Sequence, residues 1–259
     1  MAQGSRRVEQ QIMKDGKVFI CGAGPGDPRL ITLRAMELLK KCDVVLYDRL
    51  VAKELVDQIP TATEKVYVGR EVGDATSHQK RTNELMVKYA KKGSKVLRLK
   101  GGDPFIFGRG AEEAEYLDRR GIKFEIVPGI TSAIASPAYA GIPLTHRRHS
   151  SSVAIVTGHE DAEKGEMAVR WDRLAGAVDT IVVLMGIGQL GQISRDLIRA
   201  GMKKSTRVAI IASGTTDKQR VVRGTIATIA GVVKKADVRP PAVIVIGRVA
   251  GLERLGWFR

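Results

Sequence analysis

The chain has 259 residues, which is long enough for one large domain or two compact ones, and we expect two. It carries 43 Lys and Arg against 28 Asp and Glu, so its formal net charge is +15. Such a charge favours an anionic partner, either a nucleic acid, a membrane surface or a small polycarboxylate. Aromatic residues make up only 5% of the chain and do not alternate with basic runs, which argues against stacking on single-stranded nucleic acid.

The cysteines and the N-terminus indicate the compartment. Cys21 and Cys42 lie in apolar surroundings without metal-type spacing, so we expect two buried thiols rather than a disulfide. No apolar run is long enough to span a bilayer, and the first residues lack the apolar core of a signal peptide. We therefore expect a cytoplasmic protein in which residues 1–15 form a loose arm.

Strands and helices alternate along the first half. A glycine loop from Gly22 to Gly26 follows the first strand, and Asp27 with Pro28 is expected to begin a helix. Thr76 and Gln79 form a capping box for a later helix. The predicted strands of this half are residues 17–21, 43–47, 65–68, 95–99 and 124–127, and a further helix is predicted over 111–120.

The alternation starts again after a Gly/Pro-rich passage. Strands are predicted over residues 152–157, 180–185, 207–212 and 242–246, with helices over 189–200 and 225–235. We expect two α/β domains, residues 1–146 and 147–259. Strands this apolar suit sheets covered on both faces by helices, which place ligands at strand carboxyl ends or between domains.

The first loop, GAGPGD at residues 22–27, is a poor dinucleotide fingerprint. It lacks the third glycine, and Pro25 removes an amide that a phosphate cradle would use. A ligand-free turn is the alternative for this loop alone. GGDP at residues 101–104 has the same two interpretations: its glycines allow close backbone approach to a ligand, or Asp103 satisfies local amides in a strand-ending turn.

Several long motifs in order resemble the tetrapyrrole methylases, and within them best the uroporphyrinogen III C-methyltransferases. They are VFICGAGPGDPRLITLRA (18–35), DVVLYDRLV (43–51), LKGGDPFIFGRG (99–110) and VPGITSAIASPAYAGIPLTHR (127–147). The resemblance implies a class III methyltransferase fold of two α/β domains, with the active site in the cleft between them. It also implies a homodimer.

The resemblance further implies that S-adenosylmethionine is the methyl donor and S-adenosylhomocysteine the product. The cofactor positions carried over are Pro25, Gly101, Gly102, Asp103, Ile106, Thr131, Ser132, Met185, Ala212 and Ala242. Thr131 and Ser132 also suit the start of a helix. Ala212 lies in ASGTT, which matches the family pattern only loosely.

The substrate implied by the resemblance, uroporphyrinogen III, carries eight carboxylates. Arg49, Arg109 and Arg147 lie in the matched motifs, and guanidinium groups bind carboxylates in paired hydrogen bonds. Asp48 and Glu112 are the carboxylates expected near the tetrapyrrole, either of which could hold a pyrrole N–H or accept its proton, and Arg109 is counted with them as catalytic. The alternative for Glu112 is a first-turn acid favoured by the helix dipole.

The implied reaction is methylation at carbons 2 and 7, which gives precorrin-2 for sirohaem or cobalamin. Alternatives with the same fold are methylation of a later corrin precursor and, less favoured, methylation of ribosomal RNA ribose. We expect no metal, because His146 and His149 lack a third ligand with convincing spacing. His159 is expected to be structural or at the cavity wall, and neither nucleic acid nor membrane is an expected partner.

Overall fold

The computed structural model describes residues 16–69, 75–158 and 169–252. Three expectations fall outside these residues: the arm over 1–15, the side chain of Thr76 in the capping box, and the place of His159. Within the described ranges, none of the helices combines the length and apolar character that a bilayer-spanning segment needs.

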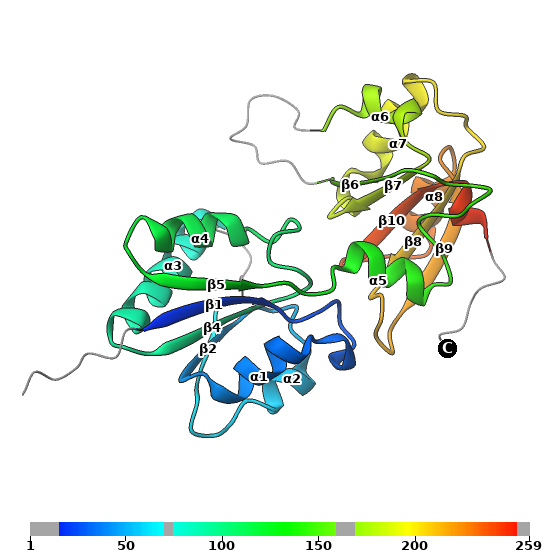
Figure 1. Cartoon of the computed structure of the whole chain (residues 1–259). Coiled ribbons are helices and arrows are strands. Elements are labelled where there is room, and N and C mark those ends of the chain that lie inside the picture. The colour runs from blue at the N-terminus through cyan, green and yellow to red at the C-terminus, as the bar shows by residue number, and fades with distance from the viewer. Residues whose placement is uncertain (1–15, 70–74, 159–168, 253–259) are drawn as a thin grey trace, which may run out of the picture.

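The first sheet is parallel, with strand order β3-β2-β4-β1-β5 (Figure 1). All its strand pairs run in the same direction. Its strands are β1 (Lys17–Gly22), β2 (Val44–Tyr47), β3 (Glu64–Tyr67), β4 (Lys95–Lys100) and β5 (Lys123–Val127). The helices that connect or follow them are α1 (Leu33–Lys41), α2 (Lys53–Asp57), α3 (Ala75–Lys91) and α4 (Gly110–Asp118).

Helices cover both faces of this sheet, as Figure 1 shows. Because side chains alternate along a strand, Val18 and Ile20 of β1 pack in one core with α3 and α4, while Phe19 and Cys21 pack in the other with α1 and α2. Two faces covered in this way explain why the strands are apolar along their whole length.

The second sheet is mixed, with strand order β6-β7-β10-β8-β9. Among the described strands of this sheet, only β6 and β7 pair in parallel, and β10 lies antiparallel between β7 and β8. Its strands are β6 (Val153–Thr157), β7 (Thr180–Leu184), β8 (Arg207–Ala212), β9 (Arg220–Thr225) and β10 (Ala242–Gly247). The helices α6 (Trp171–Ala177), α7 (Leu190–Arg199) and α8 (Ile229–Lys235) pack on one face.

The other face of the second sheet is covered by α5 (Ser132–Tyr139). Ala133 of this helix is buried in one core with Val182, Ile211 and Val243. This helix precedes the expected domain boundary at residue 146, and its buried face packs against β7, β8 and β10. Sequence order alone does not reveal this packing.

The predicted α/β fold with two sheets is confirmed, and most strand bounds agree within one residue. The start of the first helix differs from the prediction: Asp27 caps a short 3-10 turn at Pro28–Leu30, and Thr32 caps α1 by accepting from the amide of Ala35. Among the described elements, α2, α6, the edge strand β9 and the 3-10 turn at Arg248–Gly251 were not predicted.

Candidate active site

The loops that follow β1, β4 and β5 meet at the carboxyl edge of the first sheet. A Cβ on Gly22 would lie 2.4 Å from the carbonyl oxygen of Gly102, and one on Gly129 would lie 2.3 Å from the same oxygen. The amide of Gly102 donates to the carbonyl of Gly24 at 2.7 Å. Only glycine permits such an approach, so the glycines of these three motifs bring their loops into direct backbone contact.

One side of Gly102 stays open. Its φ is +71°, and a Cβ there would meet nothing nearer than the Thr131 Cα at 3.9 Å and the Ser132 amide nitrogen at 4.0 Å. Thr131 caps α5, since its Oγ1 accepts from the amide of Ala133 at 3.3 Å. Two further expected cofactor positions are half-buried in the same loops: Pro25 and Gly101.

Asp103 ties two of these loops together. Its Oδ1 accepts from the amides of Phe105 at 2.8 Å and Ile106 at 3.1 Å, and its Oδ2 accepts from the amide of Gly129 at 3.0 Å. Asp103 therefore satisfies two local amides, as the structural interpretation of GGDP expects, and one amide of the loop after β5. Each carboxylate oxygen has more than one lone pair, so these bonds leave acceptor capacity. The side chain of Ile106 is 39% exposed.

Three expected cofactor positions of the second half also share one edge. Met185 directly follows β7, has a φ of +55° and is 52% exposed. Ala212 at the end of β8 is the register partner of Ala242 at the start of β10, and the next residue, Val243, is the partner of Leu184. The sheet thus brings Met185, Ala212 and Ala242 together, and buries Ala212.

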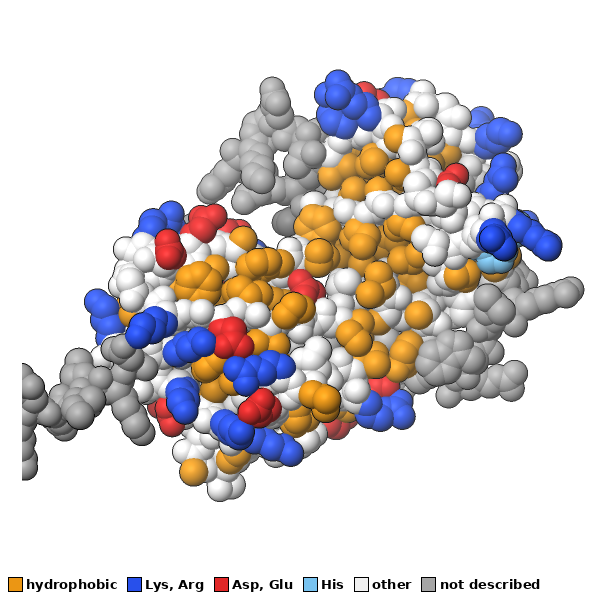
Figure 2. Space-filling model, in the orientation of Figure 1, with side chains coloured by type: hydrophobic (Ala, Val, Ile, Leu, Met, Phe, Trp, Pro, Cys, Tyr) orange, Lys and Arg blue, Asp and Glu red, His pale blue; other side chains and the backbone are white. Residues whose placement is uncertain are grey.

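The first loop contacts the second half of the chain. The amide of Asp27 donates to Thr215 Oγ1 at 3.1 Å, and the Tyr139 hydroxyl donates to Asp27 Oδ2 at 3.1 Å. A Cβ on Gly26 would lie 3.3 Å from the carbonyl oxygen of Gly214. Bonds from Arg29 lower the pKa of Asp27 to about 2. Hydrophobic side chains gather where the two halves adjoin on the face shown in Figure 2.

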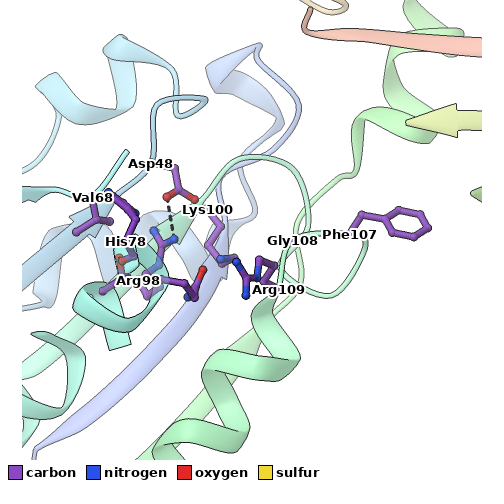
Figure 3. Close-up of a pocket in the computed structure, with 10 residues that line it drawn as sticks. Asp48, Val68, His78, Arg98, Lys100, Phe107, Gly108 and Arg109 are labelled. Carbon is purple, nitrogen blue, oxygen red and sulfur yellow. Dashed lines mark hydrogen bonds and ion pairs between the residues drawn. The ribbon is translucent and has the colours of Figure 1, made fainter. Parts of the chain in front are cut away.

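A polar pocket of about 200 Å³ lies beside the carboxyl edge of the first sheet (Figure 3). Asp48 and Arg109 both line it, together with Arg98 and Lys100 of β4. The remaining lining residues are Val68, His78, Gln79, Thr82, Phe107 and Gly108. Two of the expected substrate and catalytic residues are thus brought into one cavity with two cations that were not expected.

The other expected arginines are exposed. Arg49 follows Asp48 directly, whereas Arg147 lies in the turn before β6, in the second half of the chain. Arg109 pairs with Glu112, with Nη2 2.6 Å from Oε2, and both side chains are about half exposed. Glu112 lies in the first turn of α4, where the helix dipole favours an acid, so that alternative is also satisfied.

A buried charge cluster that was not predicted from the sequence lies beside this pocket and consists of Arg98, Lys100 and Glu113. Their side chains are 4%, 4% and 0% exposed. Lys100 lies two residues after Arg98, so both project from the same face of β4, toward α3 and α4. Charges at alternate positions of an otherwise apolar strand were the signal that could have identified them.

The fold and these loops define a class: two-sheet α/β proteins whose candidate site is built from strand-end loops of both halves. Family comparison agrees, since a model described as Tetrapyrrole (Corrin/Porphyrin) Methylases matches residues 17–230. The chain belongs to this family.

Two relatives match over most of their length. A protein of Methanosarcina barkeri named S-adenosyl-L-methionine-dependent uroporphyrinogen III methyltransferase is 49% identical over 92% of this chain and 93% of its own. A uroporphyrinogen-III C-methyltransferase of Bacillus subtilis is 50% identical over 94% of this chain and 95% of its own. A siroheme synthase of Methylobacillus flagellatus is 44% identical over 99% of this chain, which spans only 56% of that protein.

A solved structure shares the fold. It is a uroporphyrin-III C-methyl transferase from Thermus thermophilus, complexed with S-adenyl homocysteine. It is 40% identical, covers 90% of this chain and 98% of its own, and superposes with a TM-score of 0.77.

Proposed function

We propose that this protein transfers methyl groups from S-adenosylmethionine to uroporphyrinogen III. The observation that carries the proposal is identity of 49% and 50%, over more than nine tenths of the chain, to two proteins named for this reaction. The strand-end loops of both sheets, which supply the expected ligand positions, support it. Two successive methylations, at carbons 2 and 7, would give precorrin-2 for sirohaem or cobalamin formation.

The loops of both halves fit a nucleoside cofactor. The backbone beside Gly102 is open to a ligand, and the exposed apolar side chains of Ile106 and Met185 are suited to cover a purine or thioether. When bound, S-adenosylmethionine supplies the methyl group. The residues proposed to hold it are Pro25, Gly101, Gly102, Asp103, Ile106, Thr131, Ser132, Met185, Ala212 and Ala242.

The chain's own contribution to the chemistry is positioning and proton handling. Arg49, Arg109 and Arg147 are proposed to bind substrate carboxylates, which a guanidinium grips with two parallel hydrogen bonds. Asp48 is proposed to accept or hold the pyrrole proton, and Glu112 orients Arg109 through their ion pair. Alignment of two reactants can lower a barrier by roughly 7 to 11 kcal/mol, so positioning is the larger part.

We propose that the enzyme is a cytoplasmic homodimer. Burial raises the pKa of both Cys21 and Cys42 above the ordinary thiol value, which suits inert thiols in a reducing compartment. Large apolar side chains that stay exposed on the chain would be covered in part by a second copy; they include Leu33, Phe105 and Ile134. Light scattering on the purified protein measures the oligomer.

Anaerobic incubation with uroporphyrinogen III and methyl-labelled S-adenosylmethionine tests the activity. Mass analysis should show a gain of two labelled methyl groups on the tetrapyrrole. If the cofactor binds and the tetrapyrrole gains no label, the acceptor is a later corrin precursor or RNA, and the proposal fails.

A further inference from the structure

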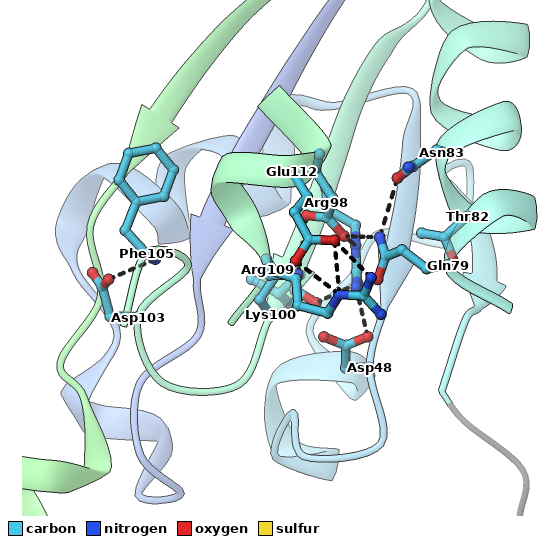
Figure 4. A network of polar contacts seen from close by, with 12 residues as sticks. Asp48, Gln79, Thr82, Asn83, Arg98, Lys100, Asp103, Phe105, Arg109 and Glu112 are labelled. Carbon is cyan, nitrogen blue, oxygen red and sulfur yellow. Dashed lines mark hydrogen bonds and ion pairs between the residues drawn. The ribbon is translucent and has the colours of Figure 1, made fainter. Parts of the chain in front are cut away.

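Asp48 pairs with Arg98, as Figure 4 shows. Arg98 is a buried cation that is itself paired with a buried acid, Glu113. Arg98 Nη2 lies 2.8 Å from Asp48 Oδ1, and Arg98 Nε lies 3.0 Å from Glu113 Oε1. Lys100 Nζ lies 3.0 Å from the second oxygen of Glu113. Gln79 of α3 adds a bond from Nε2 to Glu113 Oε1 at 3.1 Å. Glu113 therefore contacts both cations, and Arg98 bridges it to Asp48.

Among the described charged residues in this chain of contacts, only Asp48 is partly exposed to the pocket. The Asp48 side chain is 27% exposed, whereas Glu113 is completely buried. Burying several charges costs desolvation energy that a well-packed apolar group would avoid, so such a cluster is weak evidence for a stabilising role. What the cluster does provide is a fixed geometry: the guanidinium is planar, and binding it on two edges fixes its direction.

We propose that Glu113 is a positioning residue for Asp48: it fixes the Nε edge of Arg98, so that Nη2 points at the Asp48 carboxylate, and it balances the charge of Arg98 and Lys100. The inference rests on the proposed role of Asp48 as the group that handles the pyrrole proton. Among the described residues, the hydrogen bonds of Asp48 use Oδ1 with Arg98, which leaves Oδ2 for the pocket.

The charge balance matters because several elements around Asp48 contribute charged or titratable groups. Arg98 and Lys100 come from β4, Glu113 from α4, Arg109 from the turn before α4, and the titratable His78 from α3. The pKa of Glu113 lies below its ordinary value, because Arg98 and Lys100 outweigh the effect of burial, so this acid is charged at neutral pH. The formal charges of Arg98, Lys100, Glu113 and Asp48 sum to zero.

Glu113→Gln removes one negative charge and keeps the shape of the side chain. Asp48 then faces an excess positive charge, which should lower its pKa relative to that in the wild-type protein. Selective ¹³C labelling of aspartate carboxyls reads this pKa directly by NMR in the cofactor-free protein, with Asp48→Asn identifying the resonance. Glu115→Gln on the exposed side of the same helix is the control and should leave the pKa unchanged.

Activity gives a second readout. Because a weaker base accepts a proton less readily, kcat of Glu113→Gln should fall about 3- to 10-fold, with the acid limb of the pH profile moved down and the KM for S-adenosylmethionine unchanged. Glu113→Asp keeps the charge with a shorter reach, so its Asp48 pKa should stay near the wild-type value. If Glu113→Gln fails to fold, Glu113→Asp is the variant in which the Asp48 titration and kcat are measured.

An unchanged Asp48 titration in Glu113→Gln would overturn the proposal, as would equal losses of kcat in both Glu113 variants with an unmoved acid limb. The NMR titration needs no turnover. It therefore still tests the coupling if Asp48→Asn proves fully active or if the wild-type protein fails to methylate uroporphyrinogen III, either of which would instead refute the proposed function.

Discussion

Asp103 and Arg109 belong to one sequence motif, but the structure gives them different surroundings. The Asp103 carboxylate accepts three hydrogen bonds from backbone amides of two loops. Its loss would therefore loosen the backbone on which the proposed cofactor positions lie. Arg109 instead lines the polar pocket and pairs with Glu112 at the surface. Asp103 organises the backbone and Arg109 presents a charge to the pocket, so substitutions of the two residues should change different measured quantities.

Asp103→Ala should weaken S-adenosylmethionine binding by about 10- to 100-fold, the loss expected when hydrogen bonds to a charged group are removed. Arg109→Ala should leave that affinity within about twofold, since exposed ion pairs contribute little, and should raise the KM for uroporphyrinogen III. Calorimetric titration of the cofactor into both variants separates them. Equal losses of affinity would contradict this division of roles.

Asp27 is a second residue whose role can be measured, in this case through the pH dependence of stability. Its pKa is lowered to about 2, first by the side-chain bond from Arg29, so the folded state binds its proton less tightly than the unfolded chain. The carboxylate therefore adds stability above the unfolded pKa near 4, and this stability is lost as the pH falls toward 2. Because Arg29 is 79% exposed, we expect only about 1 kcal/mol.

Urea unfolding of the wild type and Asp27→Asn at several pH values tests this. The difference in free energy of unfolding should be constant from pH 7 to 5 and shrink below pH 4. A difference that grows as the pH falls would show that the sign is wrong.

At the scale of elements, the contact between the loops after β1, β4 and β5 depends on glycine. Gly22→Ala would place a Cβ 2.4 Å from the backbone oxygen of Gly102, which cannot move as a flexible side chain could. We expect a loss of about 1 to 3 kcal/mol in stability, as for overpacking of a tight site, and weaker cofactor binding.

Gly231→Ala is the matched control, because this glycine lies inside α8 and a Cβ there meets nothing within 4 Å. It should be neutral or stabilising by up to about 1 kcal/mol. Thermal unfolding of both variants checks the prediction, and a Gly22→Ala protein as stable as the wild type would contradict the close approach.

The elements that were predictable are those whose own side chains carry the pattern. β1, β7, β8 and β10 are apolar runs, and the sequence shows them directly. β9 was missed because it is an edge strand that begins at an exposed arginine, Arg220, and has Arg223 and Gly224 near its other end. The mixed strand directions of the second sheet and the packing of α5 also could not be predicted from the sequence, because they depend on how distant segments pair.

Some residues of the candidate site could likewise be predicted from the sequence, and others could not. Asp48 and Arg109 lie in recognisable motifs and were placed together by the fold, whereas the sequence indicates the buried cluster only through the alternation of Arg98 and Lys100 with apolar residues. Their burial follows from α3 and α4 covering that face of β4, which is a tertiary property. A charged residue at an inward-facing strand position shows its role only once its covering helices are known.

For the whole molecule, the net charge of +15 should act on the octa-anionic substrate before contact is made. Raising the salt concentration from about 0.05 to 0.5 M shortens the screening length to a few Å, so the KM for uroporphyrinogen III should rise severalfold while kcat stays nearly constant. The KM for S-adenosylmethionine, which carries little net charge, should change far less and is the internal control.

Initial rates at a series of sodium chloride concentrations measure both constants. A parallel rise of the two would indicate that salt acts on the fold, whereas a change in the tetrapyrrole constant alone would show that the positive field of the protein contributes to substrate capture.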